Sequence, residues 1–296
     1  MSYNYEARLS TERMVPLVFK MAMPAVAAQL VNLLYGIVDR IYIGHIPQIG
    51  TDALAGVGVT TSIILLISAF SAIVGGGGAP LAAIALGQND RERAGRILGN
   101  GVLLLVAFTV VTSLTAYVFM EPLLLLTGAS VHTLVYAVDY LSVYLMGTIF
   151  VELSTGLNTF INAQGRPAVA MYSVLIGAVL NIALDPLFIF AFGMGVKGAA
   201  VATVISQACS AVWVLRFLIS SRASLRIEWR CVRPERKVIV PIVALGVSPF
   251  IMASTPLAWI ASGELPARSR YSAAPCRSPA SMRAQAALRL AVWSCG

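Results

Sequence analysis

Long apolar stretches separated by short polar segments dominate the chain. Uncharged runs cover 53–89, 97–120 and 198–215, and each approaches or exceeds the roughly 17 to 25 residues that a membrane-spanning helix needs. The apolar residues of 62–70 do not alternate with polar ones, which argues against the spanning strands of a barrel. The pattern predicts helical spans at 14–43, 53–86, 97–120, 133–163, 167–191 and 198–219.

Several of these spans contain residues that bend helices or let them pack closely. Pro24 lies in the first span and Pro186 in the fifth, and a proline inside a helix removes a backbone hydrogen bond and introduces a kink. The run Gly75 to Gly78, followed by Pro80, predicts either a bend in the second helix or close approach of a neighbouring helix.

The chain changes character after the sixth span. A seventh apolar stretch begins but gives way to a segment rich in Ala, Ser, Arg and Pro, in which no 20-residue apolar run occurs and disorder or a weak surface helix is expected. The abrupt change suggests translation out of frame. We therefore expect a cytoplasmic N-terminus (1–13), a six-helix transmembrane lobe (14–219), a basic cytoplasmic linker (220–237), the start of a broken seventh helix (238–255) and an aberrant tail (256–296).

Composition and charge support a membrane protein. With 58% apolar and 11% charged residues and a mean hydropathy of +0.82, the chain has too little polar surface to cover a soluble globule of 296 residues. The net charge of +8 is spread unevenly, because basic residues gather in alternate loops such as 91–96 and 216–237. This alternation follows the positive-inside rule and predicts a cytoplasmic N-terminus. It favours a lipid bilayer as partner and argues against nucleic acid.

Other reactive residue types form no recognisable site. The four cysteines lack metal-ligand spacing, and His45 and His132 are far apart in the sequence. No cofactor and no enzymatic activity are therefore expected. The polar opening precedes a long span rather than a short apolar core with a cleavage site, so the first helix is expected to serve as an uncleaved insertion signal.

The most informative polar residues are two carboxylates inside apolar spans. Asp39 and Asp185 each lie 19 residues beyond a basic residue, Lys20 and Arg166 respectively. At about 1.5 Å per residue, both would lie roughly 28 Å above these anchors, in the outer half of the bilayer. A carboxylate in hydrocarbon costs about 2.5 to 3.5 kcal/mol on insertion scales, so it usually faces a wet cavity lined by protein. Two carboxylates at one depth suggest one shared site.

Polar neighbours accompany both carboxylates. Tyr35 lies one helical turn below Asp39. Asn181 lies one turn below Asp185, and Thr203 of the sixth span falls at about the same level. Oxygen atoms of these types are the ligands that a hard cation such as Na⁺ prefers, and the carboxylates could instead hold a proton. In the structural alternative, the first carboxylate pairs with the adjacent arginine or reaches the interface, and the other polar groups cap or join helices.

Three further polar residues lie on the fourth span. Glu152 precedes Arg166 by 14 residues, or roughly 21 Å, which is near the middle of the bilayer. It is a candidate for contact with substrate or a proton, and the alternative is a helix–helix hydrogen bond. Asp139 and Tyr140 lie nearer the outer end and are expected to line an outer mouth or the interface.

Three ordered motifs resemble the MATE (multidrug and toxic compound extrusion) family of transporters, in its prokaryotic type with an acidic first helix. They are LLYGIVDRIYIGHIPQIGTDALAGVG at 33–58, ALGQNDRERAGRILGN at 85–100 and the stretch from NAQGRPAVAMYS to VATVISQ at 162–207. The resemblance covers about 14–255. It implies a twelve-helix antiporter of two six-helix lobes, in the cytoplasmic (inner) membrane of a bacterium or archaeon, that exports cationic or amphipathic drugs in exchange for H⁺ or Na⁺.

The resemblance also assigns roles to particular residues. It implies a coupling-ion site in this lobe, helped by rearrangement of the first helix and by a tyrosine of the fourth helix, which corresponds to Tyr140 or Tyr144. The implied ion ligands are Asp39, Asn181, Asp185 and Thr203, and the implied participants in the first helix are Pro24 and Tyr35.

The chain departs from the family pattern where the second lobe should follow. VALGVSPFIMAST at 243–255 is similar to that lobe's opening helix and then breaks off. Because the family's sites depend on two lobes around a central cleft, we expect a truncated antiporter with little independent transport. The alternatives are a half-size protein that dimerises into a transporter or regulates one, and a lipid-linked precursor flippase, which would call for a more cationic cavity.

Overall fold

The computed structural model describes residues 14–227 and 233–261, and the regular elements of these residues are helices. Seven of the described helices are long and apolar enough to cross a membrane, so the chain is a multi-pass helical membrane protein. The helices are α2 (Met14–Gly44), α3 (Gly50–Gly87), α4 (Arg91–Val118), α5 (Met120–Leu126), α6 (Val131–Ala163), α7 (Pro167–Pro186), η1 (Leu187–Ala191), α8 (Val196–Ile219) and α9 (Arg236–Ala261).

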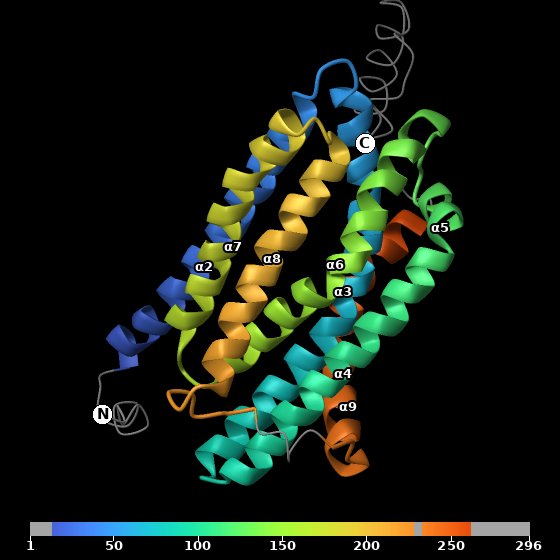
Figure 1. The fold of residues 1–296 in the computed structure, drawn as a ribbon. Coiled ribbons are helices and arrows are strands. Elements are labelled where there is room, and N and C mark those ends of the chain that lie inside the picture. The colour runs from blue at the N-terminus through green and yellow to red at the C-terminus, as the bar shows by residue number, and fades with distance from the viewer. Residues whose placement is uncertain (1–13, 228–232, 262–296) are drawn as a thin grey trace, which may run out of the picture. The chain divides into compact units, whose positions relative to one another are not determined.

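Successive helices run up and down a bundle. The turns that precede α3, α6 and α8 lie at one end, and the turns that precede α4 and α7 lie at the other (Figure 1). Helix α6 packs against α3, α4 and α8, whereas α2 packs chiefly against α7. Helix α2 is therefore a peripheral helix held on one side, and α6 is central.

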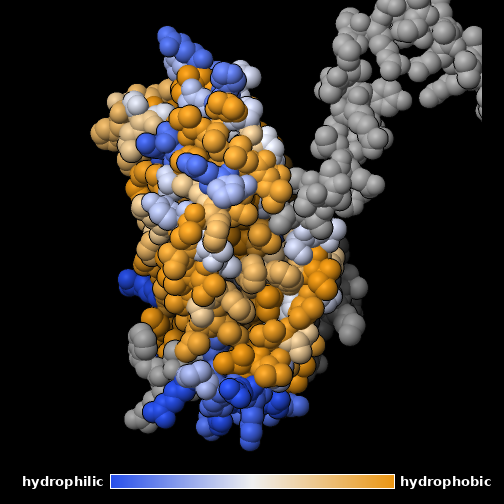
Figure 2. Space-filling view, turned by 90° about the vertical axis from the view of Figure 1, so that its right-hand side faces the viewer, coloured by the Kyte–Doolittle hydropathy of each residue, from blue (hydrophilic) through white to orange (hydrophobic). Residues whose placement is uncertain are grey.

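The surface suits a lipid environment. Figure 2 shows apolar residues over the middle of one face and hydrophilic residues gathered at its two ends. Large apolar side chains stay exposed on several helices, among them Leu33 on α2 (61%) and Leu114 on α4 (62%). Such a belt would be a liability in water but is favourable against acyl chains.

Two helices differ from the sequence-based boundaries. Helix α4 begins at Arg91 instead of 97, because the Asp90 carboxylate caps it by accepting a hydrogen bond from the Arg93 amide (2.9 Å). The expected outer loop contains the short helix α5, whose Leu124 is fully buried among residues of α3 and α6. Capping by Asp90 thus sets the start of α4, and burial of an apolar run explains the presence of α5.

The two predicted kink points behave differently. Helix α2 continues as α-helix through Pro24. At Pro186 the α-helix ends and the π-helical turn η1 follows. Proline donates no backbone hydrogen bond, which weakens the α-helical ladder at that point, and π-helical turns inside helices often accompany functional sites.

Helix α9 is longer than expected. It begins at Arg236 and continues to Ala261, so the break expected at residue 255 does not occur there. The predictions for 1–13 and 262–296 concern residues outside the described part of the chain. The apolar sequence PLAWIA at 256–261 allows the helix to continue.

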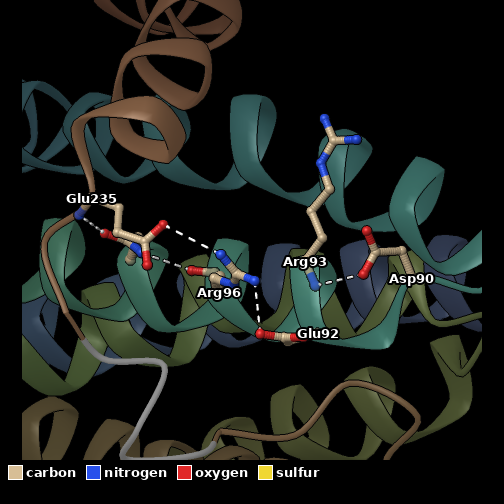
Figure 3. A network of polar contacts seen from close by, with 6 residues as sticks. Asp90, Glu92, Arg93, Arg96 and Glu235 are labelled. Carbon is tan, nitrogen blue, oxygen red and sulfur yellow. Dashed lines mark hydrogen bonds and ion pairs between the residues drawn. The ribbon is translucent and has the colours of Figure 1, made fainter.

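The start of α9 is fastened to α4 by a polar network (Figure 3). The amide of Glu235 donates a hydrogen bond to Asn100 Oδ1 (3.0 Å), and Asn100 Nδ2 donates to the Arg96 carbonyl (2.9 Å). The Arg96 guanidinium pairs with Glu92 at 2.7 Å and with Glu235 at 3.9 Å. The network fixes the point at which the chain enters α9.

The glycine run of α3 packs closely against its neighbours. A Cβ at Gly77 would overlap the Ile242 carbonyl oxygen of α9, and a Cβ at Gly246 would overlap the Ile73 carbonyl oxygen of α3. Of the two predicted roles for this run, close helix packing is therefore the one observed. We call this contact between α3 and α9 the glycine seam.

Candidate functional site

Helices α7 and α8 bring three of the predicted ligands into contact. Asn181 Nδ2 donates hydrogen bonds to Asp185 Oδ1 (3.2 Å) and Thr203 Oγ1 (3.3 Å), and Thr203 Oγ1 donates to the Ala199 carbonyl (3.0 Å). Asn181 and Asp185 are one helical turn apart on α7, which puts both on the same face. Asn181 is 2% and Asp185 0% exposed. The amide thus ties the carboxylate to the hydroxyl.

Asp39 approaches this group from α2. Helix α2 packs along α7, and Asp39 lies close enough to Asp185 and Tyr140 for its charge to act on both. Arg40 is exposed and near enough for its charge to act on Asp39, but among the described residues no direct ion pair joins the two. The arginine pairing considered as a structural alternative is therefore not observed.

Three oxygen atoms in this group have no hydrogen-bond partner although they are buried. They are Asp39 Oδ1, Asn181 Oδ1 and Asp185 Oδ2. Buried polar atoms are nearly always satisfied, so three such acceptors on adjacent helices are unusual. All three accept and none donates, which is the arrangement that a cation or a proton completes. We call the residues that contribute these oxygens, together with Thr203, the carboxylate cluster.

Two tyrosines of α6 extend from the cluster toward the interior. Tyr140 lies beside Thr203, and its ring stacks on that of Tyr144 with 6.0 Å between centroids. Tyr140 therefore belongs to the cluster's surroundings rather than to an outer mouth, which was the expectation from its position along the span. Asp139 lies nearer the N-terminal end of α6, where it pairs with Lys197 at 3.2 Å.

Glu152 is placed apart from the carboxylate cluster. It is 2% exposed on α6 and accepts hydrogen bonds from two serines of α3, Ser68 (2.9 Å) and Ser71. The helix–helix hydrogen bond considered for it is thus present. Its neighbours on α3 were not singled out in the sequence.

A cavity of about 470 Å³ opens between α2, α3, α6, α7 and α8, and Tyr35 and Tyr144 lie in its wall. Its volume falls in the range of drug-sized sites. Sequence reasoning missed its carboxamide side chains because amides in apolar spans give no strong individual signal. The spacing of three residues between the pair on α2 and of four residues between the pair on α6 was the available clue. These residues are Gln29, Asn32, Asn158, Asn162 and Gln207.

Pro24 occupies a different position from the cluster residues. It precedes the cavity-lining residue Ala25 on α2, whereas Asp39 lies four turns further along the helix. Pro24 therefore sits at the cavity end of α2, and Tyr35 is the residue of this helix that links cavity and cluster.

Comparison with known proteins gives one consistent family. Residues 24–187 match the MatE family. Over 232 residues the chain is 25% identical to the multidrug export protein MepA of Staphylococcus aureus, a match that covers 78% of this chain and 51% of MepA.

Solved structures agree. A MATE structure in the bent conformation matches with a TM-score of 0.73 and 26% identity, covering 79% of this chain and 52% of the other. A MOP superfamily transporter from Pyrococcus furiosus, whose binding pocket is described as reversed in polarity, matches with a TM-score of 0.74 and 26% identity, covering 80% and 52%. The chain spans about half the length of the relatives it matches.

Proposed function

The chain belongs to the MatE family, and from this premise we propose that it forms the ion-coupling lobe of a multidrug efflux antiporter driven by H⁺ or Na⁺. The family match over 24–187 and the MATE fold support a transporter rather than an enzyme. The observation that carries the ion-coupling part is the set of three buried acceptor oxygens without donors on α2 and α7.

We assign the coupling ion to the carboxylate cluster. Na⁺ would find carboxylate oxygens from Asp39 and Asp185, the amide oxygen of Asn181 and the hydroxyl of Thr203, which are hard oxygen ligands. A proton would instead neutralise one of two interacting carboxylates. Either occupant relieves repulsion between α2 and α7, so its arrival and departure bias how the two helices pack.

The position of Tyr35 couples ion binding to the shape of the cavity. Tyr35 lines the cavity and lies one turn from Asp39 on α2. A shift of α2 on ion binding would therefore move a wall of the drug site. In the proposed cycle, ion binding rearranges α2, reduces the cavity and releases an amphipathic drug outward. Ion release to the inside restores the cavity.

The test measures ion binding to the purified chain in lipid nanodiscs. Calorimetry follows the binding of Na⁺, and a pH indicator follows the protons that the chain binds or releases. Asp39→Asn and Asp185→Asn should each abolish ion uptake. Asp139→Asn is the matched control, because that carboxylate pairs with Lys197 near the N-terminal end of α6 and should leave uptake unchanged. Ion uptake retained in both cluster variants would refute the assignment.

Transport itself is tested in a chimaera that joins this lobe to the second half of a MepA-type relative. Cells that express the chimaera should export a dye such as ethidium when a sodium or proton gradient is applied. The two cluster variants should insert normally and export nothing. Gradient-driven export by either variant would argue against coupling through these carboxylates.

A second arrangement is supported by the exposure of α2. None of the residues in its most apolar window is buried, so the helix presents an uncovered surface. Two copies that associate through this surface would enclose a central cleft between two lobes. Mass photometry in nanodiscs distinguishes the cases, since a stable dimer with dye export would favour this arrangement and a monomer would exclude it.

A further inference from the structure

Four arginines from three separate segments meet at the end of the bundle where α7 begins and α8 ends. Arg166 precedes α7, Arg216 lies in the last turn of α8, and Arg222 and Arg226 follow in the linker. The start of α7 and the end of α8 lie at the same end of the bundle (Figure 1), and the two helices pack against each other. We call these four residues the arginine corner.

Two side-chain contacts join the start of α7 to the end of α8. The guanidinium carbon of Arg166 lies 5.8 Å from the centroid of the Phe217 ring on α8. One turn earlier on α8, the Trp213 indole nitrogen donates a hydrogen bond to the Val169 carbonyl of α7 (3.4 Å). Since Arg216 adjoins Phe217 in the chain, these contacts bring Arg166 to the turn of α8 that contains Arg216.

The linker is folded back onto the same place. The Leu225 amide donates a hydrogen bond to Gln164 Oε1 (3.0 Å), and Gln164 lies two residues before Arg166. Leu225 is buried, whereas Arg222 and Arg226 on either side of it are exposed. The anchored backbone therefore presents both linker arginines to the surroundings close to the start of α7.

Acidic side chains do not balance the arginine corner in the part of the chain that the structure describes. The ion pairs found there join Arg96 to Glu92 and Glu235, and Lys197 to Asp139. Like charges that are held close together repel one another, and a shared anion relieves this repulsion. Guanidinium groups form strong hydrogen bonds with phosphate oxygens. The corner is thus suited to a phosphate group.

An apolar stripe on the outside of α8 leads to the corner. Ile205, Val212 and Ile219 recur at every seventh residue and are exposed, and Arg216 lies on the same face of the helix. Gln207, which lines the cavity, lies on the opposite face. A lipid whose phosphate reached the corner would place its acyl chains along this stripe, whereas inorganic phosphate gains nothing from it.

We propose that the arginine corner binds the headgroup of an anionic phospholipid, whose acyl chains lie along the exposed stripe of α8. Trp213 is exposed between stripe and corner, and indole rings favour the boundary between membrane and water. The bound lipid would hold the start of α7 against the end of α8. The inference uses neither the coupling ion nor the cavity, so it does not rest on the proposed function.

The experiment measures which lipid lies next to Trp213. The other tryptophans are replaced by Trp229→Phe, Trp259→Phe and Trp293→Phe, and the full chain is reconstituted in phosphatidylcholine vesicles that contain a minor fraction of phosphatidylglycerol. Two preparations have the same composition, but brominated acyl chains, which quench indole fluorescence, are carried by the phosphatidylglycerol in one and by an equal amount of phosphatidylcholine in the other. Quenching should be stronger in the first preparation, because the corner enriches the anionic lipid beside the indole.

Paired variants test whether the arginines cause this enrichment. Each basic residue near an anionic lipid surface contributes about fivefold, so Arg166→Gln combined with Arg216→Gln should lower the association constant of phosphatidylglycerol relative to phosphatidylcholine by about tenfold or more. Arg166→Lys combined with Arg216→Lys keeps both charges and should retain most of the preference. Arg91→Gln combined with Arg93→Gln is the matched control, because it removes two exposed charges at the start of α4, outside the corner. It should change the preference by less than about twofold.

Other results would overturn the proposal in distinguishable ways. Equal quenching of the unmodified chain in both preparations would show that no anionic lipid is enriched. Equal losses in the α4 control and the glutamine pair would indicate general attraction by the basic end instead of a site. Loss in the lysine pair as well would trace the effect to a disturbed contact between α7 and α8. A preference abolished by inorganic phosphate at constant ionic strength would assign the corner to a soluble anion.

Discussion

Asn181 joins Asp185 of α7 to Thr203 of α8 in the carboxylate cluster. Its amide nitrogen donates to Asp185 and Thr203, and its amide oxygen is buried without a partner. One face of the side chain thus holds the cluster together while its other face is available to a ligand. An amide that performs both tasks cannot be replaced by a carboxylate or a hydroxyl without losing one of them.

Replacement of Asn181 should therefore weaken ion binding strongly. Asn181→Ala removes a ligand oxygen and the donor to the Asp185 carboxylate, and hydrogen bonds to charged groups contribute about 1.5 to 3 kcal/mol each. Sodium-dependent thermal stabilisation of the purified chain should shift to concentrations at least about tenfold higher. Asn158→Ala, which alters another amide of the bundle, bonded to Ser173, serves as control. Equal sodium dependence in both variants would contradict the prediction.

The sequence allowed a better prediction of the carboxylate cluster than of the cavity wall. Depth along the helix placed Asp39 and Asp185 together, and helical periodicity added Asn181. These inferences work because a carboxylate in an apolar span is rare and because residues one turn apart share a face. The carboxamide wall escaped notice because an amide such as Asn32 is compatible with either packing or function.

At the scale of helices, one side chain determines where α4 begins. The Asp90 carboxylate accepts from the Arg93 amide at the N-terminus of the helix (Figure 3), and negative charge there also complements the helix dipole. Asp90→Ala should lower the free energy of unfolding by about 1 kcal/mol. Asp90→Asn keeps the capping oxygen and should cost less. Chemical unfolding in detergent micelles compares the two, and equal losses would show that capping is not the cause.

The glycine seam gives a second prediction for helices. Gly77→Val would push a side chain into the α9 backbone at Ile242, and overpacking of this kind costs about 1 to 3 kcal/mol. The expected response is displacement of α9 from α3. Spin labels at Gln88→Cys and Lys237→Cys, in a chain without other cysteines, should report a longer or broader distance distribution.

The same helix provides the control for that experiment. Gly58 is another glycine of α3, and a Cβ there would meet no atom within 4 Å. Gly58→Val should therefore leave the label distances unchanged. It is a matched control because it changes the intrinsic helix propensity of α3 by the same residue exchange as Gly77→Val. A displacement of α9 that occurred with both variants would trace to α3 itself and not to the seam.

Helix identity was largely predictable, and the details were not. Apolar runs long enough to cross a bilayer indicate spanning helices by length alone. The short helix α5 and the π-helical turn η1 depend on contacts that lie far apart in the sequence, such as Leu124 packing against α3 and α6. The extent of α9 was underestimated because the change in composition after residue 255 suggested that the helix ends there, whereas the helix continues to Ala261.

At the scale of the whole molecule, charge distribution predicts orientation. The turns between α3 and α4 and between α6 and α7 lie at the same end of the bundle (Figure 1), and basic residues flank both turns in the sequence. We therefore expect this end in the cytoplasm. In intact bacterial cells, a membrane-impermeant maleimide should label His132→Cys and spare Gln88→Cys, both in a background without native cysteines. Permeabilised cells should show labelling at both positions, and the reverse pattern in intact cells would invert the topology.

The glycine seam also has a mechanical consequence. At another helix contact a glycine meets a side chain, since a Cβ on Gly147 of α6 would overlap Val204 of α8. At Gly77 and Gly246 two backbones meet directly, with no protruding side chains to climb over one another. A contact of this kind resists separation through close approach. Because Phe70 of α3 also packs on Phe250 of α9, with 5.1 Å between the ring centroids, sliding along the helix axes would have to carry these rings past each other, so we expect α3 and α9 to move as one rigid unit.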